Sequence, residues 1–177
     1  MQQKHNDKIY GLNILGDIYR SFELAEKYGV SFIQIDSVCG HLEPDLDEEY
    51  ESMLKFLRRD SDCTVLGGVR FKYQPVNSGR TLDEDLRIGM GRCDAIVCTG
   101  EGTGLATPMD KVEKFKQILG DFPVIIGAGV TIDMVEACRR NSDGVIVGSW
   151  FKDNHRAEYS VNEDNVKDFM LRWNAHT

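Results

Sequence analysis

Residues 122–152, FPVIIGAGVTIDMVEACRRNSDGVIVGSWFK, contain two short apolar runs that each end in a glycine turn. The runs are PVIIGAGV and GVIVGSW, and an amphipathic stretch that opens with Thr131 lies between them. This order predicts a strand, a glycine turn, a helix, and then a second strand with its own glycine turn. In a parallel α/β fold both turns lie at the carboxyl ends of neighbouring strands, where backbone N–H groups can face a phosphate.

The rest of the chain repeats this strand-then-helix unit. Strands are expected at residues 9–15, 31–38, 63–71, 94–100, 123–129 and 144–150. Helices are expected at residues 18–28, 48–59, after 81, 108–119, after 131 and 161–173. Thr81 with Glu84 predicts a capping box at the start of the third helix, and Thr107 is predicted to cap the fourth. The strands are rich in Val and Ile, which is typical of strands that helices cover on both faces. The alternation therefore predicts an α/β fold with a parallel sheet and right-handed crossovers.

Two architectures fit this repeat, a (β/α)8 barrel and an open doubly wound sheet. Only six strands are visible in the sequence. A six-stranded arc cannot close without a change of strand tilt and shear, and it leaves two strand edges unpaired. We therefore expect parallel (β/α) repeats in an incomplete or distorted TIM barrel, formed by residues 1–177 as one domain. A second copy of the chain could cover the open edges, or the chain is a fragment of a longer protein.

Composition and charge exclude several classes of protein. The 177 residues carry a formal net charge of −8, which argues against general binding to nucleic acid. No apolar run approaches the length of about 18 residues that a membrane span needs, and the first residues lack the apolar region of a secretory signal. The five cysteines lack paired close spacing, so we expect reduced thiols in a cytoplasmic protein.

The two glycine turns are the candidate phosphate site, with Gly127, Gly129, Gly148 and Ser149 as its residues. Glycine lets the backbone approach an anion closely, and the helix after the first turn would point its N-terminus there. The alternative is that these glycines only permit tight turns. Lys152 follows the second turn and could also meet an anion.

Three ionisable residues at the same ends of strands are candidate catalytic groups. Asp36 ends the second expected strand and could act as a base, a metal ligand or a hydrogen-bond acceptor. Lys72 follows the third strand and could contact phosphate, stabilise an enolate or form a Schiff base. Glu101 belongs to a glycine-rich loop, GEGTG, which lacks the spacing of a nucleotide-binding loop. Capping carboxylates and a solvated lysine are the alternatives.

Two neutral residues, Asn13 and Thr99, are further candidate ligand contacts. Asn13 lies inside an apolar run and must find hydrogen-bond partners, from a ligand or from the backbone. His41 lies in an acidic loop with Glu43 and Asp45, but no fixed ligand spacing is present, so no metal site is predicted. The sequence indicates no particular cofactor.

Four segments, DAIVCTGEGTG, PVIIGAGVT, SDGVIVGSWFK and VNEDNVKDFM, resemble the BtpA/SgcQ family in their order and spacing. Proteins of that family are predicted to be (β/α)8 barrels related to phosphate-binding TIM-barrel enzymes. The segments GLNIL, SFIQIDSV and GGVRFKY look like the family's third, fourth and fifth strands, with Lys72 at the family's lysine position. The resemblance implies that this chain begins about two strand–helix units after the family's first strand. Tyr73 and Gln74 replace basic residues of the family.

The resemblance implies an enzyme that binds a phosphorylated sugar or a nucleotide-like metabolite, without fixing the reaction. An alternative is a non-catalytic binding or assembly factor, because the family takes its name from a biogenesis factor of photosystem I. A degenerate, truncated member that keeps only the phosphate site is the third possibility.

Overall fold

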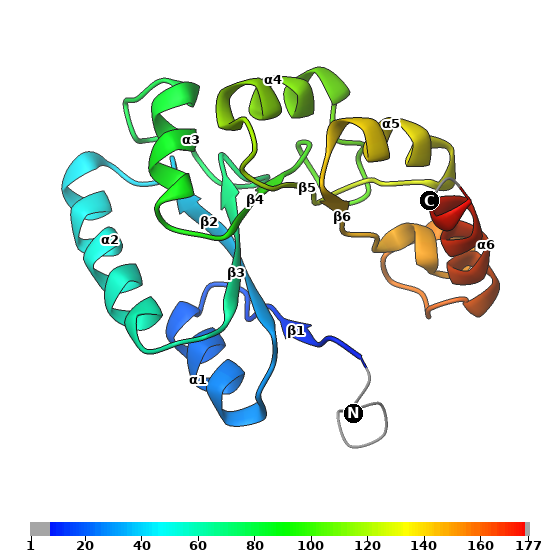
Figure 1. Cartoon of the computed structure of the whole chain (residues 1–177), viewed down its shortest axis with the longest axis horizontal. Coiled ribbons are helices and arrows are strands. Elements are labelled where there is room, and N and C mark those ends of the chain that lie inside the picture. Colours follow the sequence, from blue (N-terminus) through cyan, green and yellow to red (C-terminus); the bar gives the residue numbers. More distant parts are fainter. Residues whose placement is uncertain (1–7, 176–177) are drawn as a thin grey trace. The chain divides into compact units, whose positions relative to one another are not determined.

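The computed structural model describes residues 8–175 (Figure 1). Within this range six strands form one sheet, paired in sequence order from β1 to β6. The strands are β1 (Gly11–Leu12), β2 (Phe32–Cys39), β3 (Thr64–Val69), β4 (Ala95–Cys98), β5 (Val124–Ile126) and β6 (Gly144–Val145). The helices are α1 (Ile18–Tyr28), α2 (Pro44–Arg59), α3 (Leu82–Met90), α4 (Met109–Leu119), α5 (Val135–Asn141) and α6 (Glu163–Asn174). The predicted fold class, parallel (β/α) repeats of an incomplete TIM barrel, is confirmed.

The chain divides into two compact units within β4. The first unit contains β1, β2, β3 and the start of β4, together with α1, α2 and α3. The second unit contains the end of β4, then β5, β6 and α4 to α6, and it also includes Phe71–Tyr73. Each unit has its own apolar core, with Ile33, Val65 and Leu86 in the first, and Val112 and Phe115 in the second.

Local signals in the sequence set several helix ends. The Asp17 side chain accepts a hydrogen bond from the Arg20 N–H at 2.8 Å and begins α1. Gly29 ends α1 with a φ of 61°, in the left-handed region that glycine adopts without strain. Thr81 and Glu84 form the predicted capping box at the start of α3.

Three expectations about the helices were wrong, two about where a helix begins and one about its continuity. α2 begins at Pro44 and not near Glu48, because the fixed φ of proline suits the first helical turn. Thr107 does not cap α4, since Pro108 takes the cap position and the Thr107 hydroxyl bonds elsewhere. The helix expected after Thr131 is divided into a 3₁₀ turn, η1 (Ile132–Met134), and the short helix α5.

Aspartates at the amino ends of two strands hold the sheet together. Asp94, before β4, accepts a hydrogen bond from the Val65 N–H at 2.7 Å. Asp143, before β6, accepts one from the Val124 N–H at 2.8 Å. Each carboxylate thus accepts a hydrogen bond from an N–H group near the start of the preceding strand. Both aspartates therefore have a structural role.

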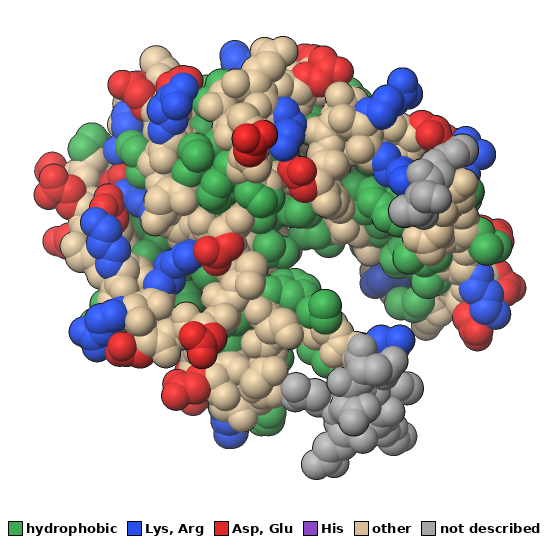
Figure 2. All heavy atoms as spheres, in the orientation of Figure 1, with side chains coloured by type: hydrophobic (Ala, Val, Ile, Leu, Met, Phe, Trp, Pro, Cys, Tyr) green, Lys and Arg blue, Asp and Glu red, His purple; other side chains and the backbone are tan. Residues whose placement is uncertain are grey.

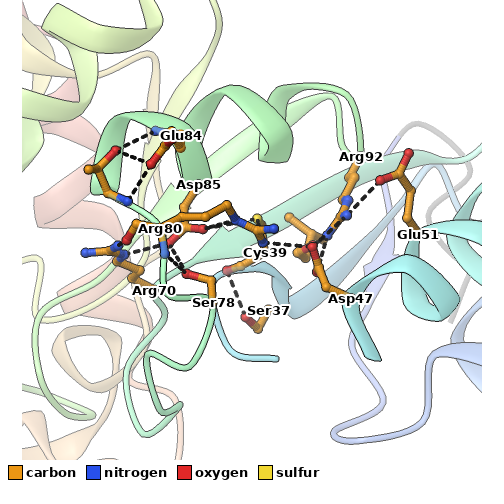
Figure 3. Close-up of polar contacts among 12 residues, drawn as sticks. Ser37, Cys39, Asp47, Glu51, Arg70, Ser78, Arg80, Glu84, Asp85 and Arg92 are labelled. Atoms are coloured by element: carbon orange, nitrogen blue, oxygen red, sulfur yellow. Dashed lines mark hydrogen bonds and ion pairs between the residues drawn. The ribbon is translucent and has the colours of Figure 1, made fainter. Parts of the chain in front are cut away.

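A chain of buried ion pairs joins α2 and α3 in the first unit (Figure 3). Arg80 lies at its centre, with Nε donating to Asp85 at 3.0 Å and Nη2 donating to Asp47 at 2.7 Å. Arg92 also donates to Asp47, at 2.6 Å, and Arg70 donates to Asp85 at 2.8 Å. Each buried carboxylate therefore has two guanidinium partners, which offset the cost of burying its charge.

These partners set the ionisation of the two aspartates. For Asp47, burial alone would raise the pKa, but hydrogen bonds from Arg92 and Arg80 outweigh burial and hold the pKa below its usual value. For Asp85, burial is likewise outweighed by hydrogen bonds from Arg80 and Arg70, and its pKa is also lowered. A depressed folded pKa contributes stability above the unfolded aspartate value of about 3.9, and this stability is lost as the pH falls through the folded pKa.

Replacing Asp85 with Asn should lower the free energy of unfolding by about 3 kcal/mol, because Arg70 and Arg80 lose a buried carboxylate. Urea unfolding at neutral pH measures this loss. As the pH falls below the unfolded aspartate value of about 3.9, the difference between the two proteins should shrink, since the wild-type carboxylate is then progressively protonated. The matched control is Asp83→Asn on the same helix, whose pair with Arg87 is exposed and whose loss should change little. Equal effects of the two substitutions would contradict this account.

Candidate functional site

The candidate site consists of three loops of the second unit, each of which follows a strand. They are Gly100–Ala106 after β4, Gly127–Val130 after β5, and Gly148–Ser149 after β6. A Cβ atom added at Gly129 would lie 2.2 Å from the carbonyl oxygen of Leu105. The first loop therefore packs directly on the second. This arrangement is expected of parallel strands, whose carboxyl ends lie at one edge of the sheet.

The third loop lies beside the first. A Cβ atom added at Gly104 would be 3.6 Å from the Ser149 Oγ atom, which is ordinary van der Waals contact. Gly148 differs from Gly129, since a Cβ atom there would meet no heavy atom within 4 Å. The space beside Gly148 is therefore open, and the structure brings the two predicted glycine turns together around the Gly100–Ala106 loop.

Two backbone donors in these turns are available to a ligand. The N–H groups of Gly129 and Gly148 donate to no acceptor among residues 8–175. Backbone N–H groups in turns can form concavities that bind anions. Because α5 is short and begins only at Val135, the backbone donors and not a helix N-terminus would provide this binding.

Thr107 fixes the position of the first loop. Its buried hydroxyl accepts a hydrogen bond from the Gly100 N–H at 3.1 Å and donates one to the Ala128 carbonyl at 3.0 Å. One side chain thus joins both ends of the Gly100–Ala106 loop to the turn after β5. The sequence suggested a helix cap at Thr107, because a threonine before a proline is typical of that position, and it did not suggest this bridge.

Lys72 and Tyr73 lie against the same loop. The Lys72 N–H donates to the Thr99 hydroxyl at 2.9 Å, and the Tyr73 hydroxyl accepts from the Thr103 N–H at 2.6 Å. Tyr73 has a φ of 63°, an uncommon conformation for a tyrosine that costs energy and occurs often at functional sites. The Lys72 ammonium lies 5.6 Å from the centre of the Phe71 ring. Sequence analysis did not identify Tyr73 as a member of the site.

The other candidates in this unit are placed differently. Thr99 is buried, and its carbonyl accepts a hydrogen bond from the Lys111 ammonium at 2.6 Å, a cation that sequence analysis missed. Glu101 is exposed on the loop after β4. The Lys152 ammonium donates to the Ala157 carbonyl, so it is engaged with its own loop and is not brought to the glycine turns.

A separate cavity of about 240 Å³ lies in the first unit, beside the carboxyl end of β1 and along β2. Polar residues of its lining include Asn13, Gln34, Asp36, Ser37, His41 and Gln74. The Tyr50 ring closes one side, with its hydroxyl donating to the Ser37 carbonyl at 2.6 Å. The sequence SFIQIDSV predicted a strand, but nothing in it indicated a cavity.

Asn13 and Asp36 meet in this cavity. The Asn13 amide donates to the Asp36 Oδ1 atom at 3.0 Å. Two expectations about them were wrong, since Asn13 is exposed beyond the end of β1, and β2 continues past Asp36 to Cys39. The strand is longer because its final residues remain paired with β3, up to the bridge between Cys39 and Val69.

The described residues show neither a metal-binding cluster nor a membrane-spanning helix. Among residues 8–175, no three His, Cys, Asp or Glu side chains form a group that could hold a metal ion. No helix in that range is long and apolar enough to cross a membrane. On the face drawn in Figure 2, acidic and basic side chains are interspersed.

Known sequences include a family and several relatives that are similar to most of this chain. The family model described as "BtpA family" matches residues 6–175. An uncharacterized protein of Thermococcus kodakarensis is 29% identical over 166 residues, which cover 90% of this chain and 63% of that protein. An uncharacterized protein of Methanocaldococcus jannaschii is 27% identical over 168 residues, with the same two coverages, 90% and 63%. The chain thus spans less than two thirds of the length of these relatives.

Solved structures are similar in fold. One, described as "Native KDPGal structure", has a TM-score of 0.64 at 14% identity and covers 98% of this chain and 73% of that one. Another, a cube-shaped, highly porous protein cage designed by fusing symmetric oligomeric domains, has a TM-score of 0.63 at 14% identity, with coverages of 98% and 56%. At this identity the likeness concerns the fold alone.

The contrast between the two glycines gives a prediction about the site. Gly129→Ala should lower the free energy of unfolding by more than about 2 kcal/mol, because its φ of 64° is strained for alanine and the new Cβ would meet the Leu105 backbone. Gly148→Ala is the matched control, since its φ is −110° and the space is open, so stability should hardly change. Urea unfolding measures both. A Gly129→Ala variant as stable as wild type would show that the Gly100–Ala106 loop is not held in this packing.

Proposed function

This chain belongs to the BtpA family, and we propose that it binds a phosphorylated sugar or a nucleotide-like metabolite through the turns after β5 and β6. The observation that carries the proposal is the meeting of these two turns at the Gly100–Ala106 loop, with unpaired N–H groups at Gly129 and Gly148. Backbone N–H groups are strong donors that need an acceptor, and phosphate oxygens supply several.

The phosphate would lie beside Gly148, where the backbone is exposed and no heavy atom lies within 4 Å of an added Cβ. In this arrangement the N–H groups of Gly129 and Gly148 donate to phosphate oxygens and Ser149 contributes its hydroxyl. Gly127 has a packing role, since a Cβ atom added there would lie 2.4 Å from the Val97 Cγ1 atom. The free energy gained is that of charge-assisted hydrogen bonds, about 1.5–3 kcal/mol for each.

Lys72 provides positive charge to this site in our proposal. Its backbone is fixed to Thr99, at the root of the loop that touches both glycine turns. Its ammonium would neutralise the phosphate or stabilise negative charge that develops on the substrate. Glu101, on the exposed part of the same loop, is proposed as a group that transfers protons. Asp36, the third predicted catalytic group, lines the separate cavity of the first unit and is not assigned to the phosphate site.

Phosphate binding can be tested by thermal unfolding with ribose 5-phosphate, a nucleoside monophosphate and inorganic phosphate. A ligand at 100 times its dissociation constant should add about 2.7 kcal/mol to the free energy of unfolding of the wild type. Gly148→Asp should abolish the gain, because a carboxylate in the open space would repel the phosphate. Gly148→Ala adds only a methyl group and should keep most of the gain. No stabilisation of the wild type by any phosphate compound would refute the proposal.

Replacement of Lys72 by Ala tests the role of its charge. Loss of one charge-assisted contact should weaken binding of ribose 5-phosphate at least about tenfold, as measured by calorimetry. The control is Lys114→Ala, which removes an exposed lysine of α4 and should leave the affinity unchanged. Equal affinities for wild type and Lys72→Ala would exclude Lys72 from the site.

A further inference from the structure

The cavity in the first unit differs in chemistry from the glycine turns. None of the residues that line it, all within the described part of the chain, is Lys or Arg. Asp36 supplies a carboxylate, and the remaining polar groups are amides, hydroxyls and an imidazole. A phosphate there would meet a negative charge without a cationic side chain to balance it. The cavity is therefore unsuited to an anion and suited to a neutral ligand.

Two atoms of residues that line this cavity lack a protein partner within residues 8–175. Asp36 uses Oδ1 to accept from Asn13, and its Oδ2 atom accepts no hydrogen bond from residues 8–175. The Nδ1 atom of His41 is buried and has no hydrogen-bond partner in the described structure. An unpaired buried nitrogen costs free energy, about 1–3 kcal/mol, and His41 is one of the residues that line the cavity.

The charge state of His41 agrees with a neutral ligand. Burial lowers the pKa of His41, so its imidazole is neutral at neutral pH, although the nearby Asp47 opposes this shift and Arg92 adds to it. A neutral imidazole has one donor and one acceptor nitrogen. The ring is held edge-on to Tyr50, with 5.2 Å between the ring centres and 82° between the planes.

We propose that this cavity binds a small neutral polyhydroxyl molecule, of the chemical class of a free pentose. A hydroxyl group both donates and accepts, so adjacent hydroxyls can pair with the Asp36 carboxylate and with either His41 nitrogen, while the Gln34 and Gln74 amides bind others. The volume of about 240 Å³ lies below the range of about 300–1,000 Å³ of drug-sized pockets, which favours a small molecule. This proposal does not rest on phosphate binding by the second unit.

A small ammonium compound is the competing ligand, because Asp36 is negatively charged. Asp36 is half-buried, and one of its oxygens is already engaged by Asn13. A cation would therefore gain only a half-buried carboxylate that already accepts one hydrogen bond. The observations favour the polyhydroxyl ligand.

The test is a titration of the ¹⁵N-labelled chain with D-ribose, followed by amide chemical shifts. Residues 34–41 and Tyr50 should shift, and saturation of these shifts gives the affinity. Asp36→Asn should weaken binding at least about tenfold, and His41→Phe, which keeps an aromatic ring beside Tyr50, about fivefold. The control is Glu26→Gln, an exposed change on α1 that should have no effect.

Several results would overturn the proposal. They are the absence of shifts with D-ribose, affinities that neither Asp36→Asn nor His41→Phe changes, and binding of propylammonium but not of D-ribose. D-ribose binding that Gly148→Asp abolishes would place the sugar in the second unit and would also overturn it. Failure of phosphate binding is a separate result, since it leaves the response of residues 34–41 to D-ribose unchanged.

Discussion

The packing of the Gly100–Ala106 loop on the turn after β5 is the contact on which the arrangement of the second unit depends. It requires glycine at position 129, because any Cβ atom would enter the backbone of Leu105. Thr107 reinforces the contact through hydrogen bonds to both sides. With the loop fixed, Lys72 is held at its root, and the N–H group of Gly129 remains without a partner. The packing that requires glycine at position 129 thus also holds a backbone donor that we propose binds an anion.

The first unit is organised by charge instead. Asp47 and Asp85 are buried between guanidinium groups, and removal of Asp85 would leave Arg70 without a carboxylate partner (Figure 3). Asp47 belongs to α2, and the same helix carries Tyr50, whose hydroxyl binds the Ser37 carbonyl beside the cavity. The ion pairs thus help to hold the wall of the proposed sugar site, although they do not line it. The two proposals thus assign an anion to the second unit and a neutral ligand to the first.

The fold could be predicted from the sequence where local signals decide it. Gly29 ends α1 and Thr81 begins α3 as expected, because both effects arise within one helical turn. The contacts of the site could be predicted only in part. The Thr107 bridge and the Tyr73 hydrogen bond join residues more than 20 positions apart, and the partners of Asp47 come from beyond the next strand. Such pairings depend on tertiary packing, which no local pattern encodes.

The central claim is that phosphate is bound by backbone donors of the two glycine turns. Titration of the ¹⁵N-labelled chain with inorganic phosphate tests this claim directly, because a hydrogen bond to an anion moves an amide proton downfield. The account predicts saturable downfield shifts at Gly129 and Gly148, with residues 34–41 of the first unit unchanged. Shifts confined to exposed lysines, or an absence of saturation at both glycines, would contradict it.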